Sequence, residues 1–407
     1  MKIMPRLNLL LFWGCPTYRD TPTFIELAMD ELLRVALRST LSRAHQTHRF
    51  DRLLVITNDP QIIKSSELEA EILLMPRPGE IFQFGRALQQ VITQAGIGLD
   101  EAIIYLGAGA GALLSDVEWT ALLDTVQNNP RSVTANNYFS ADLVGWQPAQ
   151  AISWVEQAAL DGGDNNLAWG LCRQAGLTWR TFLPANTRTF GTQFDLDTPS
   201  DAAILKLWLS RQTETKWSLL HQFLQQTTAF DAMPASRVLE ALSDFNQEVL
   251  VSGRISGQTH RLLESKSWGQ TRIISEERGM RASGREEAGR VVSLLGGLLQ
   301  NLGAQPFLAE FLPLICQAAI LDSRVLFAHQ RLKPSRRDRF NSDALQSEFV
   351  HDSVVRAFTE TTQATIINQN IPILLGGHTV VAGGLLLLLD LVPPKPYDGF
   401  YSPAHVI

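Results

Sequence analysis

Short apolar runs alternate with amphipathic stretches through the first half of the chain. Apolar residues at helical spacing predict helices in segments such as 23–43, 84–95 and 167–175. The apolar runs between the helical segments predict strands at 7–13, 52–57, 70–75, 102–106, 132–135, 142–146 and 190–196. Continuous apolar strands that alternate with helices are typical of a mostly parallel sheet covered on both faces. The pattern therefore predicts an α/β domain, which we place at residues 1–205.

The pattern changes after Met233-Pro234. Residues 206–243 have a helical pattern, and we expect them to form the junction between the two domains. After this junction, strands alternate with helices again. The expected strands are 248–252, 271–275, a run near 320–328, and 371–375; the expected helices are 258–264, 287–302 and 306–318. A strand–helix–strand order predicts a second α/β domain over residues 206–407. We recognise no known family in this half.

Composition narrows the class of protein. A length of 407 residues, with 45% hydrophobic and 19% charged residues, is typical of a globular protein with two domains. The net charge of −6 argues against a nucleic-acid partner, which needs a basic face. Three widely spaced cysteines without a C-x-x-C pair indicate thiols in a reducing compartment, so we expect a cytoplasmic protein.

No membrane partner is expected either. The apolar stretch 371–392 contains Pro372, Gly376-Gly377-His378, Gly383-Gly384 and Asp390, whereas a spanning helix needs about 20 nearly unbroken apolar residues. We predict a buried strand, a glycine turn and a short core helix there. The apolar run 7–13 is too short for a signal peptide and lacks a cleavage site after it.

The most specific motif is Phe-Asp-Leu-Asp-Thr-Pro-Ser-Asp at 194–201. Thr198 is a good helix N-cap, and Pro199 suits the first helical position. The motif resembles the D-[IL]-D-T-P-x-D signature of the molybdopterin and phospholactate guanylyltransferases. The first half therefore resembles a nucleotidyltransferase of the glycosyltransferase-A type, with a nucleotide-diphospho-sugar transferase-like sheet.

The resemblance implies a catalytic and metal-binding role for Asp195 and Asp197, with Mg²⁺ as the cofactor. Magnesium is held by one or two carboxylates together with phosphate oxygens and water. We expect only one of the two side chains to serve. The alternative is a turn at a strand end followed by a helix cap.

Two parts of the family pattern are altered. Where the family has an aspartate after the fourth strand, this chain has Gly107-Ala108-Gly109-Ala110-Gly111. The Gly107 and Gly109 backbone could offer N–H groups to an anion, or the glycines could serve close packing. In the first loop, 14–19, only Arg19 could clamp phosphates.

Other candidates come from loops at the same strand ends. The segments 14–20, 58–60, 76–86, 107–115, 136–142 and 191–198 should meet at the carboxyl edge of the sheet. Arg77, Gly79 and Gly85 match the family's base-contacting region. Asn136 and Asn137 could orient a ribose or the acceptor, although Asx turns explain them equally. The polar segment 161–166 is expected to be a loop and a helix cap.

Charged residues recur at the predicted strand ends of the second half. Arginine, carboxylate and histidine side chains gathered there predict a site for an anionic or phosphorylated ligand. We name Glu277 and His378 as catalytic candidates, with an imidazole as the general base. Other members of this set are Arg254, Glu276, Asp322, Arg324 and His329.

The leading interpretation is a nucleotidyltransferase-like protein that acts on or binds a nucleotide or a phosphorylated small molecule. One alternative is a non-catalytic nucleotide-binding or scaffold protein. The other is a phosphate-handling enzyme with its site in the second domain. The sequence leaves the base, the acceptor and the oligomeric state open.

Overall fold

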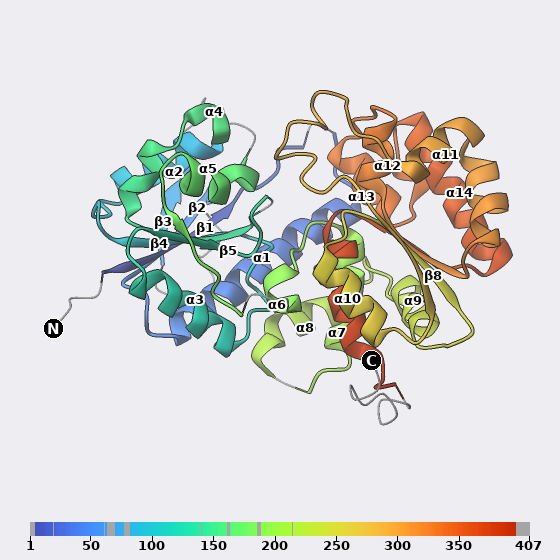
Figure 1. The fold of residues 1–407 in the computed structure, drawn as a ribbon, viewed down its shortest axis with the longest axis horizontal. Coiled ribbons are helices and arrows are strands. Elements are labelled where there is room, and N and C mark those ends of the chain that lie inside the picture. The colour runs from blue at the N-terminus through green and yellow to red at the C-terminus, as the bar shows by residue number, and fades with distance from the viewer. Residues whose placement is uncertain are drawn as a thin grey trace, which may run out of the picture. The chain divides into compact units, whose positions relative to one another are not determined.

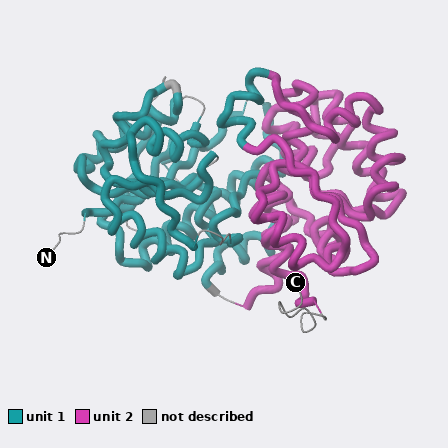
Figure 2. Tube along the Cα trace, in the orientation of Figure 1, with its two compact units in different colours: residues 1–197, 214–227, 279–288 teal, residues 198–213, 228–278, 289–407 magenta. Residues whose placement is uncertain are grey.

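The structure is a computed structural model that describes residues 5–18, 20–60, 62, 70–76, 82–139, 141–160, 163–184, 189–213 and 215–395 (Figure 1). Two compact units are distinguished by their internal contacts (Figure 2). Unit 1 comprises residues 1–197, 214–227 and 279–288, and unit 2 comprises residues 198–213, 228–278 and 289–407. The predicted domain boundary between residues 205 and 206 stays a prediction.

Unit 1 is built on a seven-stranded sheet with the order β3-β2-β1-β4-β6-β5-β7. Its strands are β1 (Leu7–Trp13), β2 (Arg52–Thr57), β3 (Glu71–Leu74), β4 (Ala102–Gly107), β5 (Ser132–Ala135), β6 (Leu143–Gln147) and β7 (Thr178–Trp179). All neighbouring pairs are parallel except the two that involve β6. The predicted mostly parallel sheet is therefore confirmed.

Helices cover both faces of this sheet (Figure 1). Along β1, Leu10 and Phe12 enter one core, whereas Leu9 and Leu11 enter the other. This is why the strand is apolar at every position except Asn8. The helices of unit 1 are α1 (Phe24–Gln46), α2 (Phe84–Gln94), α3 (Asp116–Asn128), η1 (Ala149–Trp154), α4 (Gln157–Leu160), η2 (Asp164–Asn166), α5 (Leu167–Arg173), α6 (Phe190–Gln193), η3 (Thr215–Trp217) and α8 (Ser218–Gln226).

The predicted strand at 190–196 is wrong. Residues Phe190–Gln193 form the short helix α6, because the Thr189 side chain caps the Thr192 amide at 3.2 Å. Only Asp195 retains sheet-like pairing, through an isolated antiparallel bridge to Ala110. The cap on Thr189 thus overrides an apolar pattern that fits a strand equally well.

Unit 2 contains a four-stranded, wholly parallel sheet with the order β11-β10-β8-β9. The strands are β8 (Glu248–Gly253), β9 (Gln270–Ser275), β10 (Ala318–Asp322) and β11 (Ile373–Gly376). Its helices are α7 (Pro199–Leu209), α9 (Met233–Leu242), α10 (Gly257–Lys266), α11 (Leu294–Leu302), η4 (Pro306–Phe311), η5 (Leu312–Leu314), α12 (Ser323–His329), α13 (Arg336–Asp343), η6 (Ser347–Phe349), α14 (Ser353–Gln369), η7 (Thr379–Val381) and α15 (Gly383–Leu391). The predicted second α/β unit is confirmed.

Two predicted boundaries in unit 2 need correction. The apolar run near 320–328 is a strand only to Asp322, where the neighbouring strand β11 also ends, and continues as helix α12. The helix predicted at 287–302 begins only at Leu294, because the Ser293 side chain caps it. The stretch 371–392 is a strand, a turn and a nine-residue helix, as predicted. Across the described residues, none of the helices has the length and apolar character to span a membrane.

Candidate functional site

The carboxyl edge of the first sheet has a topological switch point between β1 and β4. The chain runs from β1 to β2 on one side and later reaches β4 on the other side. Ligands of open α/β sheets bind outside the carboxyl ends of strands at such a point. The loop after β1 is tied to the loop after β2, because the Cys15 amide donates to Asn58 Oδ1 at 2.6 Å and Asn58 Nδ2 donates to the Cys15 carbonyl at 2.9 Å.

The glycine loop after β4 packs directly against the acidic motif. The Leu196 amide donates to the Gly109 carbonyl at 3.2 Å, next to the bridge between Ala110 and Asp195. The Gly107 amide donates to the Asp142 carbonyl at 3.0 Å, so this N–H group is already engaged. The geometry therefore supports close packing as the role of the loop, rather than a backbone cradle for an anion.

Four carboxylates act on one another at this edge, and we call Asp142, Asp164, Asp195 and Asp197 the acidic cluster. Burial, followed by repulsion from Asp197 and Asp164, raises the pKa of Asp195 to about 8. Burial raises the pKa of Asp142 well above its usual range, with further contributions from the other three carboxylates. Asp195 is half-buried and Asp197 is exposed. The cluster therefore holds protons that isolated carboxyl groups would lose at neutral pH.

Tyr105 orients one member of the acidic cluster. Its hydroxyl donates to Asp164 Oδ2 at 2.6 Å, and its ring lies edge-on to Phe12 and Phe84 at 5.4 and 5.2 Å. Burial raises the pKa of Asp164, while the bond from Tyr105 opposes the rise and Arg281 also favours the charged form. Burial, together with the nearby Asp164, raises the pKa of Tyr105 well above its usual range, so it remains a donor.

Two of the predicted base and ribose contacts, Gly85 and Asn136, have packing or turn-forming roles, and a ligand role for the set stays a prediction. A Cβ atom on Gly85 would lie 2.5 Å from Leu160 Cβ, so this glycine permits close packing of α2 against α4. The Asn136 side chain accepts from the amides of Asn137 at 2.9 Å and Leu143 at 3.3 Å, which closes the turn between β5 and β6. The candidates Arg19, Arg77 and Gly79 lie outside the described residues.

Glu277 and His378 do not form one constellation. Glu277 follows β9 and His378 follows β11, which are the two outer strands of the second sheet, with β8 and β10 between them. Neighbouring strands are about 4.8 Å apart, so these strand ends are separated by roughly 14 Å. Glu277 Oε1 accepts from the Val292 amide at 3.3 Å, and Glu276 accepts from the Leu294 amide at 3.0 Å at the start of α11. The two glutamates thus organise the loop after β9.

The acidic cluster supplies the hard oxygen donors that Mg²⁺ prefers. Within the residues that the structure describes, no group of three or more His, Cys, Asp or Glu side chains is arranged to hold a metal ion. One or two carboxylates are enough for Mg²⁺ when phosphate and water complete its shell. One or two carboxylates of the acidic cluster could therefore hold Mg²⁺ only if phosphate and water supplied its remaining ligands.

Sequence reasoning missed three residues of this site, namely Tyr105, Asp142 and Asp164. Asp142 and Asp164 are present in the sequence only as members of polar loops, and Tyr105 as an apolar strand residue. The available signal was position, because Asp142 immediately precedes β6 and Tyr105 is close to the end of β4. Their convergence depends on tertiary contacts between distant segments.

Comparison with known proteins gives distant structural likenesses only. No family model matches the sequence, and no curated protein matches it significantly. A protein of Desulfovibrio desulfuricans G20 assigned as a nucleotide-diphospho-sugar transferase is 14% identical, with a TM-score of 0.39; the match covers 55% of this chain and 98% of that protein. A 4-diphosphocytidyl-2C-methyl-D-erythritol synthase is 11% identical, with a TM-score of 0.32; the match covers 51% of this chain and 99% of that enzyme. At these values neither likeness informs the activity, and the fold class rests on the strand order itself.

Proposed function

We propose that unit 1 binds a nucleotide at the carboxyl edge of its sheet, in the manner of a nucleotidyltransferase-like domain. The observation that carries this proposal is the convergence of four carboxylates beside the switch point between β1 and β4. Burying carboxylates near one another costs free energy, and a cation brought by a phosphorylated ligand would offset that cost. The acidic motif at 194–197 supports the proposal because it supplies two of the four.

The residues divide into three roles. Asp195 and Asp142 would hold Mg²⁺, which when bound would neutralise charge on the nucleotide phosphates. Tyr105 fixes the position of Asp164 through the 2.6 Å hydrogen bond. Gly109 lets the 195–196 segment approach the end of β4, so that Asp195 is held rigidly.

A binding measurement tests this proposal. Calorimetry of the full chain with ATP, GTP, CTP and UTP, with Mg²⁺ and with EDTA, should detect at least one nucleotide whose affinity depends on Mg²⁺. Asp195→Asn should weaken that binding about tenfold or more, since it removes a charged ligand of the cation. Asp100→Asn is the matched control, because Asp100 is exposed at the opposite end of β4. Absence of binding to all four nucleotides under both conditions would contradict the proposal.

A non-catalytic nucleotide-binding role is the second candidate. The glycine loop 107–111 supports it, because this loop has no carboxylate, whereas the family that the acidic motif resembles has an aspartate after the fourth strand. Release of pyrophosphate from a bound triphosphate in the presence of acceptor extracts would favour catalysis. Nucleotide binding without pyrophosphate release would favour the second candidate.

A further inference from the structure

The connection between β9 and α11 contributes residues to unit 1. It covers residues 276–293, all of which are described and lie outside the helices and strands. Residues 279–288 of this connection belong to unit 1, although β9 and α11 belong to unit 2 (Figure 2). Connections of this length without secondary structure of their own are uncommon in compact domains and are often functional. We call residues 279–288 the inserted loop.

The inserted loop is ordered by its own contacts. The Ser283 amide donates to the Gly279 carbonyl, and the Arg285 amide donates to the Met280 carbonyl, both at 2.9 Å. The side chain of Met280 is fully buried and anchors the loop. The backbone at Arg281 lies between these hydrogen bonds and is therefore held in place.

The inserted loop lies beside the connection between β5 and β6, which carries Asp142 of the acidic cluster. A Cβ atom on Gly279 would lie 3.8 Å from the Cβ atom of Phe139, which is half exposed and shortly precedes Asp142 in the chain. Burial raises the pKa of Asp164, and Arg281 opposes this rise, so the Arg281 guanidinium lies near a second member of the cluster. Packing and charge thus both place the inserted loop at the acidic cluster.

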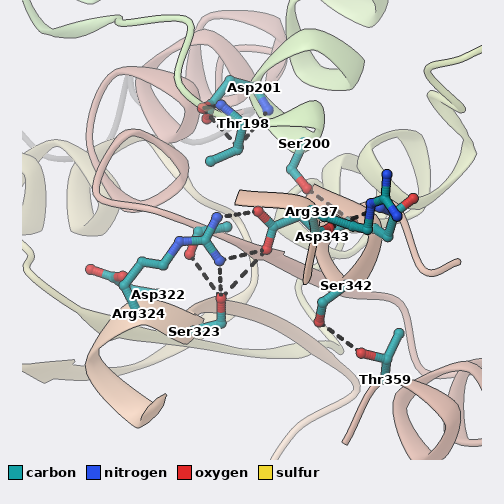
Figure 3. A network of polar contacts seen from close by, with 12 residues as sticks. Thr198, Ser200, Asp201, Asp322, Ser323, Arg324, Arg337, Ser342, Asp343 and Thr359 are labelled. Atoms are coloured by element: carbon teal, nitrogen blue, oxygen red, sulfur yellow. Dashed lines mark hydrogen bonds and ion pairs between the residues drawn. The ribbon is translucent and has the colours of Figure 1, made fainter. Parts of the chain in front are cut away.

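Arg281 is accessible to a ligand, unlike Arg324 of unit 2. Arg324 is 6% exposed, with Nη1 at 3.0 Å from Asp343 Oδ1 (Figure 3), and breaking such a buried pair is costly. Arg281 Nε donates to Glu286 Oε2 at 2.9 Å, but these two side chains are 40% and 33% exposed. An exposed ion pair adds little to stability. A phosphate group could therefore replace Glu286 as the partner of Arg281 at little cost.

Positive charge next to the acidic cluster favours a phosphorylated ligand. Mg²⁺ can join carboxylates to phosphate oxygens. A guanidinium group matches the geometry of phosphate oxygens and binds them through two parallel hydrogen bonds. In the sequence, Arg19 is the expected phosphate clamp, but it lies outside the described residues. Arg281 offers the same chemistry from a segment that is distant from the acidic motif in the sequence.

We propose that the inserted loop is part of the nucleotide site of unit 1 and that Arg281 binds a phosphate group of the nucleotide. In the free protein Arg281 pairs with Glu286, and on binding it exchanges this carboxylate for phosphate oxygens. This inference rests on the nucleotide site proposed above, and it assigns to that site a residue from the second half of the chain.

The test is calorimetry of the full chain with Mg²⁺ and whichever of ATP, GTP, CTP and UTP binds the wild type most tightly. The variants are Arg281→Gln, Arg281→Lys and Glu286→Gln. Arg272→Gln is the matched control, because Arg272 on β9 in unit 2 forms an exposed pair with Glu248 at 3.0 Å. All four variants should melt cooperatively near the wild-type temperature, because each changes an exposed ion pair.

Arg281→Gln should bind the nucleotide about tenfold more weakly than the wild type, as expected for the loss of hydrogen bonds to a charged group. Arg281→Lys should recover only part of this loss, because lysine keeps the charge but lacks the planar pair of donors. Glu286→Gln should bind several-fold more tightly, because the competing carboxylate is removed. Arg272→Gln should bind as the wild type does.

The outcomes separate this inference from the function on which it rests. If the wild type binds nucleotide and Arg281→Gln binds it equally well, the inference is overturned and the nucleotide site stands. If Arg281→Lys binds as the wild type does, Arg281 acts through its charge alone, and the proposed phosphate contact is wrong. Weaker binding by Glu286→Gln would contradict the exchange of partners. Absence of nucleotide binding to the wild type would overturn the proposed function and this inference together.

Discussion

Gly109 lies so close to Asp195 that a Cβ atom on the glycine would stand 2.3 Å from Asp195 Oδ1. The same atom would lie 2.8 Å from the Leu196 carbonyl oxygen and 2.9 Å from the Leu196 nitrogen. The acidic motif can thus pack onto the end of β4 only because residue 109 is a glycine. This contact places Asp195 within the acidic cluster.

Gly109→Ala should therefore destabilise unit 1 by about 1–3 kcal/mol, the usual cost of forcing an extra group into a packed site. Urea denaturation followed by tryptophan fluorescence measures the change. Gly14→Ala is the matched control, because a Cβ atom on Gly14, after β1, would meet nothing within 4 Å. Equal stability of the two variants would show that the 195–196 segment does not rest on the glycine loop.

The raised pKa of Asp195 predicts that the free energy of unfolding falls as the pH rises. A carboxyl group whose pKa is about 8 when folded and about 3.9 when unfolded binds more protons in the folded state between these values. The Asp195 carboxyl group makes its full contribution to the free energy of unfolding below about pH 4, and this contribution is lost as the pH rises through about 8. Asp195→Asn should thus melt like the wild type near pH 4.

At about pH 9, Asp195→Asn should be more stable than the wild type, by up to roughly 5 kcal/mol, because a pKa difference of about four units corresponds to that free energy. Thermal melts across this pH range provide the measurement, with Asp100→Asn as the exposed control. A stability difference that does not change with pH would show that the carboxyl group titrates normally in the folded protein.

The hydrogen bond from Tyr105 to Asp164 should appear as a coupling energy. Tyr105→Phe removes the donor, and should cost about 1–2 kcal/mol because a buried acceptor loses its partner. Asp164→Asn and the double variant complete a double-mutant cycle in chemical denaturation. Strict additivity would indicate that the two groups do not interact in solution.

The buried pair between Arg324 and Asp343 predicts an asymmetry between single and double variants. Arg324→Met should cost about 3–5 kcal/mol, because it leaves Asp343 charged and buried, whereas adding Asp343→Leu should recover much of the loss. Arg49→Met is the control, because Arg49 and Asp124 form a pair at 2.9 Å with 31% and 52% exposed side chains. That variant should cost at most about 1 kcal/mol. A double variant as unstable as Arg324→Met would contradict this account.

Local signals were sufficient for much of the fold. Strands β1, β2 and β4 are apolar at nearly every position because both faces are covered, and this periodicity is visible in the sequence. Helix α3 begins with a capping box between Ser115 and Glu118, where the sequence has the typical Ser-x-x-Glu spacing. Segment 190–196 was misassigned because a side-chain cap, rather than hydrophobic pattern, decides its conformation.

Less of the candidate site could be predicted from the sequence. The motif at 194–197 identified Asp195, but Asp142 and Asp164 reach it only through the contacts of β6, η2 and the glycine loop. Gly85 and Asn136 were interpreted as ligand contacts, yet their surroundings show packing and turn closure. A glycine or asparagine in a loop looks the same in the sequence whether it contacts a ligand or serves packing and turn formation. Only the residues around it in the folded structure distinguish the two roles.

The most direct test of the central claim is a calorimetric titration of nucleoside triphosphate with Mg²⁺ into the full chain at several pH values. Because Asp195 holds a proton up to about pH 8, a cation must displace it. We predict that affinity rises about tenfold between about pH 7 and pH 9, with proton release that is absent in Asp195→Asn. Nucleotide binding that is independent of Mg²⁺ and pH, and unchanged in Asp195→Asn, would contradict the claim that the acidic cluster is the cation-dependent part of a nucleotide site.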